Sequence, residues 1–190
     1  MGSCLGFGYT GHEGQALQVP KPDKIVDVAT LAASRKKKNG PSMEPSYGRH
    51  AHWLSRQGYF VVAVDWDAER VNSARLAPVA GPREVIWKVA NLQEPSSIFD
   101  SSFDLMICVH YFAESIVDRA VEALKPGGLL VLETFGGQGN NWRDLPSKGW
   151  ASRALDGKFE ILSLKENPVG PSKSNVSLRL LARKAIQRED

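Results

Sequence analysis

Asp65, an acid at the end of an apolar run, is the residue whose position points most clearly to chemistry. The run before it, 59–64, is rich in β-forming residues and follows a helix pattern over 49–57 that stops at Gly58. A helix, a glycine stop, a buried strand and a carboxylate are typical of one unit of a nucleotide-binding α/β sheet, whose ligands lie beyond the carboxyl ends of the strands. A carboxylate there can accept hydrogen bonds from both hydroxyls of a ribose. The sequence therefore predicts a nucleoside site at Asp65.

Side chains that could accept or donate a proton lie at the ends of two later apolar runs. His110 and Tyr111 come directly after the run 103–109, and Glu133 lies near the end of the run 129–134. Because imidazole titrates near neutrality, His110 could take a proton from a nucleophile. It could also be a loop histidine whose hydrogen bonds are satisfied, and Tyr111 could be a core or lid aromatic. The sequence has no CxxC or HExxH pattern, so we predict no metal site. It also has no P-loop and no G-x-S-x-G pattern.

Strand and helix patterns alternate through most of the chain. Strands are predicted over 24–29, 60–64, 84–89, 103–109 and 129–134, and a final antiparallel pair over 158–165 and 175–184 with a turn at 167–171. Helices are predicted over 49–57 and 114–124, with a short one within 147–155. A further helix is predicted to begin after Asp67, which can cap it, and to bury Val71 and Ala74 on one side. This alternation predicts an α/β fold with a doubly wound, mostly parallel sheet and helices on both faces, in three α/β/α layers.

Composition is that of a single globular domain. The chain has 190 residues, 42% of them hydrophobic, and a formal net charge of +3. The two cysteines are too few for a disulfide framework, so we expect a reduced, cytoplasmic setting. No apolar run reaches the length of a membrane span and no signal-peptide pattern opens the chain, so no membrane partner is expected.

Two segments are predicted to lie outside the regular sheet. Residues 1–22 are predicted to be a flexible lead-in, although they contain the GxGxxG pattern, because no buried strand precedes that pattern. The folded domain is predicted over 23–185. Within it, the polar and basic stretch 30–46 breaks the periodicity and is predicted to be an inserted loop.

Three segments follow one another along the chain: GRHAHWLSRQGYFVVAVDWD, FDLMICVHYF and LKPGGLLVLETFGGQGNNW. In sequence and in order they resemble the class I S-adenosylmethionine-dependent methyltransferases, and in particular their small tellurite-resistance-like, or methyltransferase-domain, type. The resemblance covers roughly 23–184. It implies a Rossmann-like sheet of seven strands, with the last two antiparallel.

The resemblance also implies a donor and residues that hold it. The donor would be S-adenosyl-L-methionine, and the product S-adenosyl-L-homocysteine. Asp65 would bind the ribose, Trp66 would pack on the adenine, and Val109 would contribute to the same site. Asn91 stands where the family often has an acid that binds the adenine amine; its neutral amide oxygen can accept that bond without charge assistance.

The first loop departs from the family pattern. The family has an acid in its first strand, followed closely by a Gly-x-Gly that lets the backbone approach the methionine part of the cofactor. Here Asp27 is separated from Gly48 by 30–46, and the earlier glycine is missing. By resemblance, Asp27 and Gly48 would still shape the methionine end, because the closure entropy of a loop grows slowly with its length.

These observations lead to a ranked set of hypotheses. The first is methyl transfer from S-adenosylmethionine to a small molecule, with His110 and Tyr111 as candidate catalytic residues. A nucleic-acid acceptor is disfavoured, because residues 110–112 replace the Asn-Pro-Pro-aromatic signature of amino-directed enzymes. The alternative is a cofactor-free binding or scaffold protein with an interrupted glycine loop. An NAD-dependent oxidoreductase is the weakest hypothesis, because it would need a GxGxxG pattern directly after the first strand and 30–46 occupies that place. The sequence indicates neither the acceptor nor the oligomeric state.

Overall fold

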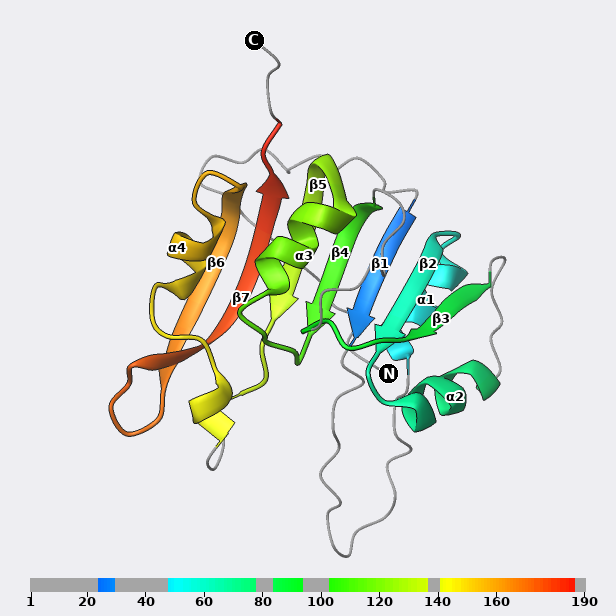
Figure 1. The fold of residues 1–190 in the computed structure, drawn as a ribbon, viewed down its shortest axis with the longest axis horizontal. Coiled ribbons are helices and arrows are strands. Elements are labelled where there is room, and N and C mark those ends of the chain that lie inside the picture. The colour runs from blue at the N-terminus through cyan, green and yellow to red at the C-terminus, as the bar shows by residue number, and fades with distance from the viewer. Residues whose placement is uncertain (1–23, 30–47, 78–83, 94–102, 137–140, 187–190) are drawn as a thin grey trace, which may run out of the picture.

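The computed structural model describes residues 24–29, 48–77, 84–93, 103–136 and 141–186, which form one sheet with helices on both faces (Figure 1). The predicted lead-in over 1–22 and the predicted inserted loop over 30–46 lie outside the described residues. The strands are β1 (Lys24–Ala29), β2 (Phe60–Asp65), β3 (Val85–Val89), β4 (Phe103–Val109), β5 (Leu124–Glu133), β6 (Phe159–Val169) and β7 (Asn175–Lys184). The helices are α1 (Arg49–Arg56), α2 (Ala68–Leu76), α3 (Ile116–Ala123), α4 (Trp150–Leu155) and the 3-10 helix η1 (Asn141–Asp144).

The sheet has seven strands in the order β3-β2-β1-β4-β5-β7-β6. Strands β1 to β5 pair in parallel, whereas β7 pairs antiparallel with both β5 and β6. The predicted α/β class and the predicted antiparallel final pair are therefore confirmed. Strand order reverses between β1 and β4, so the carboxyl ends of β2, β1 and β4 lie next to one another. Sheets of this type bind ligands at such a reversal.

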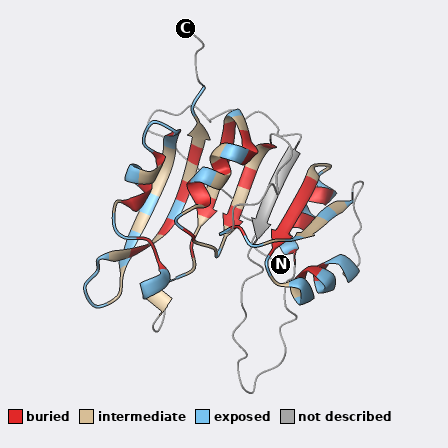
Figure 2. Cartoon of the chain, in the orientation of Figure 1, coloured by how far each residue is buried: buried red, intermediate tan, exposed pale blue. Residues whose placement is uncertain are grey.

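Two hydrophobic clusters pack on opposite faces of the sheet. Ala51 and Leu54 of α1 pack with Val61 and Ala63 of β2. The alternate β2 residues Val62 and Val64 join a larger cluster that includes buried residues of α3 and α4. Because successive strand side chains point to opposite faces, the two clusters confirm a three-layer arrangement. Figure 1 shows α3 and α4 in front of the sheet and α1 behind it, and Figure 2 shows buried residues concentrated in the central strands.

Local signals explain where α2 begins. The Asp67 side chain accepts hydrogen bonds from the backbone N–H groups of Glu69 and Arg70, at 2.9 and 3.3 Å, so it is the predicted N-cap. Val71 and Ala74 are buried, as the sequence pattern predicted. The Asp67 cap and the buried residues Val71 and Ala74 together make α2 begin directly after β2.

None of the helices in the described ranges is long and apolar enough to span a bilayer.

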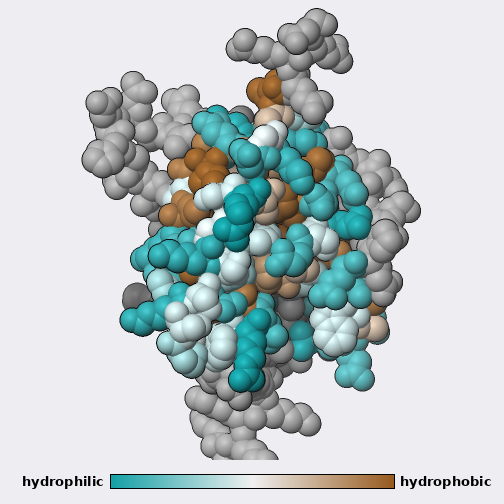
Figure 3. All heavy atoms as spheres, turned by 60° about the vertical axis from the view of Figure 1, so that its left-hand side comes forward, coloured by the Kyte–Doolittle hydropathy of each residue, from teal (hydrophilic) through white to brown (hydrophobic). Residues whose placement is uncertain are grey.

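The predicted turn at 167–171 is wrong at its start. β6 continues through Pro168 to Val169 and pairs with β7 over that length. Proline, which has no N–H group to donate, is tolerated because β6 is an edge strand of the sheet. Figure 3 shows mostly hydrophilic side chains on this side of the molecule, and polar edges discourage pairing with another chain.

Candidate functional site

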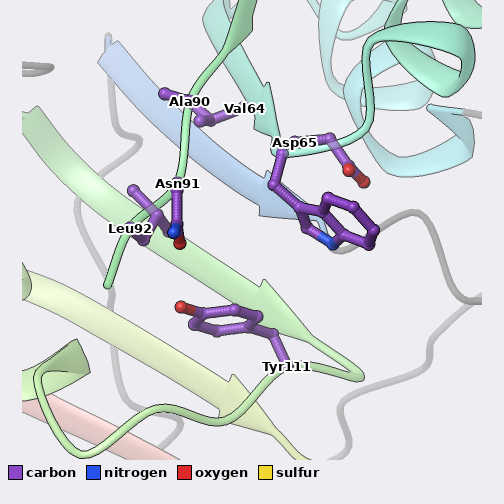
Figure 4. Close-up of a pocket in the computed structure, with 7 residues that line it drawn as sticks. Val64, Asp65, Ala90, Asn91, Leu92 and Tyr111 are labelled. Atoms are coloured by element: carbon purple, nitrogen blue, oxygen red, sulfur yellow. The ribbon is translucent and has the colours of Figure 1, made fainter. Parts of the chain in front are cut away.

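The structure brings four of the predicted site residues together at the reversal of strand order. Asp65 and Trp66 come from the end of β2, Asn91 follows β3, and Tyr111 follows β4. They line one pocket together with three apolar neighbours that the sequence did not indicate: Val64, Ala90 and Leu92 (Figure 4). The described lining of this pocket does not include the other predicted site residues: Asp27, Gly48, Val109 and His110.

Backbone hydrogen bonds hold Asp65 in place. The residue is 4% exposed, and its Oδ1 accepts a hydrogen bond of 2.8 Å from the backbone N–H of Asp67. Its carbonyl oxygen accepts the N–H of Ala90 at 2.9 Å, which ties the end of β2 to the segment after β3. An ionised carboxylate has about four acceptor positions, so the bond to Asp67 does not exhaust it. Asp65 therefore has the chemistry to accept hydrogen bonds from a diol while its own orientation is held.

Asn91 and Trp66 give the pocket a polar and an aromatic neighbour. Asn91 is exposed, and its Oδ1 accepts a hydrogen bond of 3.1 Å from the backbone N–H of Gln93, which orients the amide. Figure 4 shows the Asn91 side chain pointing toward Tyr111. Trp66 is 61% exposed, so a large aromatic surface is available next to the buried Asp65. A planar, polar-edged ligand such as a nucleobase suits such a combination.

Tyr111 contributes a buried hydroxyl. Its ring packs against the large core cluster, and no described residue forms a hydrogen bond with its oxygen. Burial, reinforced by the nearby Cys108, raises the pKa of Tyr111 to about 12. The phenol is therefore protonated at neutral pH and can donate a hydrogen bond.

A second group of polar side chains lies at the ends of β4 and β5. His110 is exposed and has φ 58, a left-handed backbone conformation that is uncommon for residues other than glycine. The backbone N–H of His110 donates to the backbone carbonyl oxygen of Glu133 at 2.6 Å. The Glu133 carboxylate accepts a hydrogen bond of 3.1 Å from the Arg179 side chain. These contacts link His110 to β5 and β7.

His50, in the first turn of α1, belongs electrostatically to the same group. Burial lowers its pKa, as do the positive charges of Arg49 and His110, and Glu133 acts in the opposite direction. The sequence indicates only a histidine at a helix start. Its proximity to the end of β4 depends on how α1 packs, and no local pattern carries that information.

The three remaining predicted residues, Gly48, Asp27 and Val109, lie at the start of α1, in β1 and at the end of β4. Gly48 precedes α1 with φ 68, and a Cβ there would overlap the Trp87 indole, so packing already requires glycine. Asp27 pairs with Ala63 of β2, and Val109 pairs with Ala29 of β1. Within the described ranges, no group of three or more His, Cys, Asp or Glu residues is placed to hold a metal ion.

Residues 46–128 match the protein family described as "Methyltransferase domain". This range contains the ends of β2, β3 and β4, and with them all four predicted residues of the pocket. A comparison with curated proteins gives no match.

Solved structures with the same fold include three methyltransferases. A SAM-dependent methyltransferase from Methanosarcina mazei has a TM-score of 0.57 and 19% identity, covering 87% of this chain and 93% of that one. The N-methyltransferase NodS from Bradyrhizobium japonicum, in complex with S-adenosyl-L-homocysteine, has a TM-score of 0.57 and 12% identity, covering 86% and 78%. A TehB-like SAM-dependent methyltransferase from Corynebacterium glutamicum has a TM-score of 0.55 and 23% identity, covering 87% and 82%.

Proposed function

We propose that this chain, a class I S-adenosylmethionine-dependent methyltransferase by its fold and its matched domain, methylates a small-molecule acceptor in the cytoplasm. The observation that carries the donor side of the proposal is the pocket that Asp65, Asn91 and Tyr111 line together. The tellurite-resistance-like subtype stays a prediction.

The residues of the pocket suit an adenosine group. The buried carboxylate of Asp65 accepts hydrogen bonds from the ribose hydroxyls, and its bond to the Asp67 N–H keeps it oriented for them. Trp66 offers its exposed indole to the face of the base, and the Asn91 amide meets the base edge. When bound, S-adenosylmethionine supplies an electrophilic methyl group, and its product is S-adenosylhomocysteine.

The methionine end of the donor belongs, in this proposal, to the ends of β1 and β4 and the start of α1. Asp27 and Gly48 shape this region, and Val109 borders it from β4. Asp27 and Val109 lie close to the reversal of strand order, because β1 pairs with both β2 and β4. Gly48 is assigned to this region by the resemblance alone, because the Trp87 indole fills the space that its Cβ would take.

The acceptor, in this proposal, lies beside His110. An exposed imidazole can take the proton that a protic acceptor loses on methylation. His50 is another candidate proton acceptor, because burial lowers its pKa and so favours the neutral imidazole. Tyr111 is the weaker base candidate of the predicted pair His110 and Tyr111, since its raised pKa keeps the phenol protonated. We propose a small molecule in preference to a nucleic acid because residues 110–112 lack the Asn-Pro-Pro-aromatic signature.

No observation favours the cofactor-free alternative, and a pair of ligands separates it from the proposal. 5′-Methylthioadenosine contains the ribose and base but lacks the amino-acid part of S-adenosylhomocysteine. A protein with an intact donor site binds S-adenosylhomocysteine more tightly than 5′-methylthioadenosine. Equal affinities would locate the defect at the methionine end, and binding of neither ligand would favour the alternative.

The direct test is calorimetric titration of S-adenosylhomocysteine into the wild type and the Asp65→Ala variant. Hydrogen bonds to charged groups contribute about 1.5–3 kcal/mol each. Removing two of them is therefore expected to weaken binding by roughly a hundredfold or more. Asp67→Ala is the matched control, because Asp67 is a neighbouring acid whose side chain caps α2. A folded wild type that produces no heat at millimolar ligand, or an Asp65→Ala variant with unchanged affinity, would contradict the proposal.

A further inference from the structure

The Tyr111 hydroxyl stands out in the donor pocket because it is buried and forms no hydrogen bond with any residue in the described ranges. A buried polar group without a partner is unfavourable, and such groups in folded proteins commonly mark a binding or catalytic site. The ring itself is held by the core cluster, so the hydroxyl has a defined position.

The surroundings of the hydroxyl belong to the base side of the pocket. Figure 4 shows Tyr111 opposite the segment that carries Asn91 and Leu92, with the Asn91 amide pointing toward the Tyr111 ring. All three residues line the same pocket as Asp65. With the ribose at Asp65 and the exocyclic amine at Asn91, the ring edge of the base is the part of the ligand that Tyr111 can reach.

We infer that the Tyr111 hydroxyl donates a hydrogen bond to a ring nitrogen of the adenine and so makes Tyr111 a residue that selects the base. The inference rests on the proposed function, because it takes the pocket to be the donor site. It gives Tyr111 a binding role in place of the acceptor-side role that its position after β4 predicted.

The chemistry of the phenol fits a donor. Because burial raises the pKa of Tyr111 to about 12, the O–H group stays protonated through the physiological pH range. The ring nitrogens of adenine accept hydrogen bonds, so donor and acceptor match. Asn91 can then serve the exocyclic amine with its oxygen, while Tyr111 serves the neighbouring ring nitrogen.

The experiment combines one protein change with single-atom changes in the ligand. Affinities of the wild type and Tyr111→Phe are measured by calorimetry for S-adenosylhomocysteine and its 1-deaza, 3-deaza and 7-deaza analogues, each of which replaces one ring nitrogen with C–H. Tyr59→Phe is the matched control, because Tyr59 is a half-buried tyrosine that packs in the cluster on the other face of the sheet.

The expected result is a selective loss. Tyr111→Phe weakens S-adenosylhomocysteine binding by about three- to tenfold, the range for one hydrogen bond. One deaza analogue binds the wild type more weakly by a similar factor, and Tyr111→Phe no longer distinguishes that analogue from S-adenosylhomocysteine. The melting temperature of unliganded Tyr111→Phe does not fall, because the hydroxyl has no hydrogen-bond partner among the residues that the structure describes. Tyr59→Phe leaves the ligand preferences unchanged.

Three results would overturn the inference. Tyr111→Phe could bind all four ligands as the wild type does, or it could lose affinity for all four by the same factor, which indicates a change of pocket shape. A lower melting temperature of the unliganded variant would show that the hydroxyl has a partner in the protein. In each of these cases the wild type still binds S-adenosylhomocysteine, so the proposed function survives. A wild type that binds none of the four ligands would overturn both.

Discussion

Replacing Gly48 with alanine tests how the start of α1 is held in place. Gly48 has φ 68, and a Cβ at this position would overlap the Trp87 indole and lie 3.3 Å from the Cβ of Ala74. Two separate penalties follow. One comes from the left-handed backbone conformation, which disfavours any residue with a Cβ, and the other comes from steric overlap with β3 and α2.

The size of each penalty can be worked out from these contacts. The left-handed conformation costs roughly 1–2 kcal/mol for an L-residue. Overpacking a well-filled site costs typically about 1–3 kcal/mol. We therefore expect Gly48→Ala to lower the free energy of unfolding by about 3 kcal/mol, which for a protein of this size lowers the melting temperature by roughly 6–12 °C.

Gly157 provides a control that isolates the backbone penalty. It has φ 66, almost the same as Gly48, but a Cβ there would have nothing within 4 Å. Gly157→Ala should therefore show the backbone penalty alone, about 1–2 kcal/mol. Thermal unfolding followed by circular dichroism measures both variants. If Gly48→Ala melts at the same temperature as Gly157→Ala, the steric part of the reasoning is wrong.

A second change locates the overlap. Trp87→Phe shortens the side chain that faces Gly48, so the double variant Gly48→Ala/Trp87→Phe should be more stable than the sum of the two single effects predicts. We expect a coupling energy of about 1–3 kcal/mol, in the range found for residues in contact. Additive effects would mean that Trp87 does not set the penalty at Gly48.

Three other changes test local features of the fold and the site. Asp67→Ala removes the N-cap of α2 and should lower the free energy of unfolding by about 1 kcal/mol in urea denaturation, with little change in ligand affinity. Lys184→Met removes hydrogen bonds to two carbonyl oxygens where α3 ends, one of them at 2.6 Å, and should cost about 1 kcal/mol, whereas Lys165→Met on the exposed side of β6 should cost much less. His50 should titrate below 6.5 by NMR; because its pKa is lowered in the folded state, the unfolded state binds the proton first, so stability should fall as pH drops below 6.5, and less so in His50→Gln.

The parts of the fold that the sequence predicted well are those governed by local chemistry. β4 was predicted to the residue, because an uninterrupted apolar run leaves few alternatives for a buried strand. The start of α2 was predicted because Asp67 can satisfy the N–H groups of a first helical turn by itself. The resemblance predicted seven strands with an antiparallel final pair, and the observed strand order brings Asp65, Asn91 and Tyr111 to one end of the sheet.

The parts that the sequence did not predict depend on contacts between distant segments. β6 extends past Pro168 because ten residues of β7 are available to pair with it, and that pairing outweighs the local turn signal. The proximity of His50 to His110 depends on the packing of α1 across the sheet. The left-handed conformation of His110 has no local signal either, since residues other than glycine rarely adopt it.

The donor pocket is built from residues that lie outside the predicted insertion at 30–46. The residues that line the pocket come from the ends of β2, β3 and β4, all of which follow the insertion in sequence. The start of α1 is set by contacts of Gly48 with Trp87 and Ala74, which also lie beyond it. Among the residues proposed to bind the donor, Asp27 alone precedes the insertion in sequence. The insertion can therefore impair binding of the methionine part of the donor while it leaves the ribose and base contacts in place. The affinity of the Asp65 site for adenosine is therefore expected not to depend on 30–46. Methyl-transfer activity needs the whole donor to be aligned, so an effect of the insertion is expected in the rate of transfer.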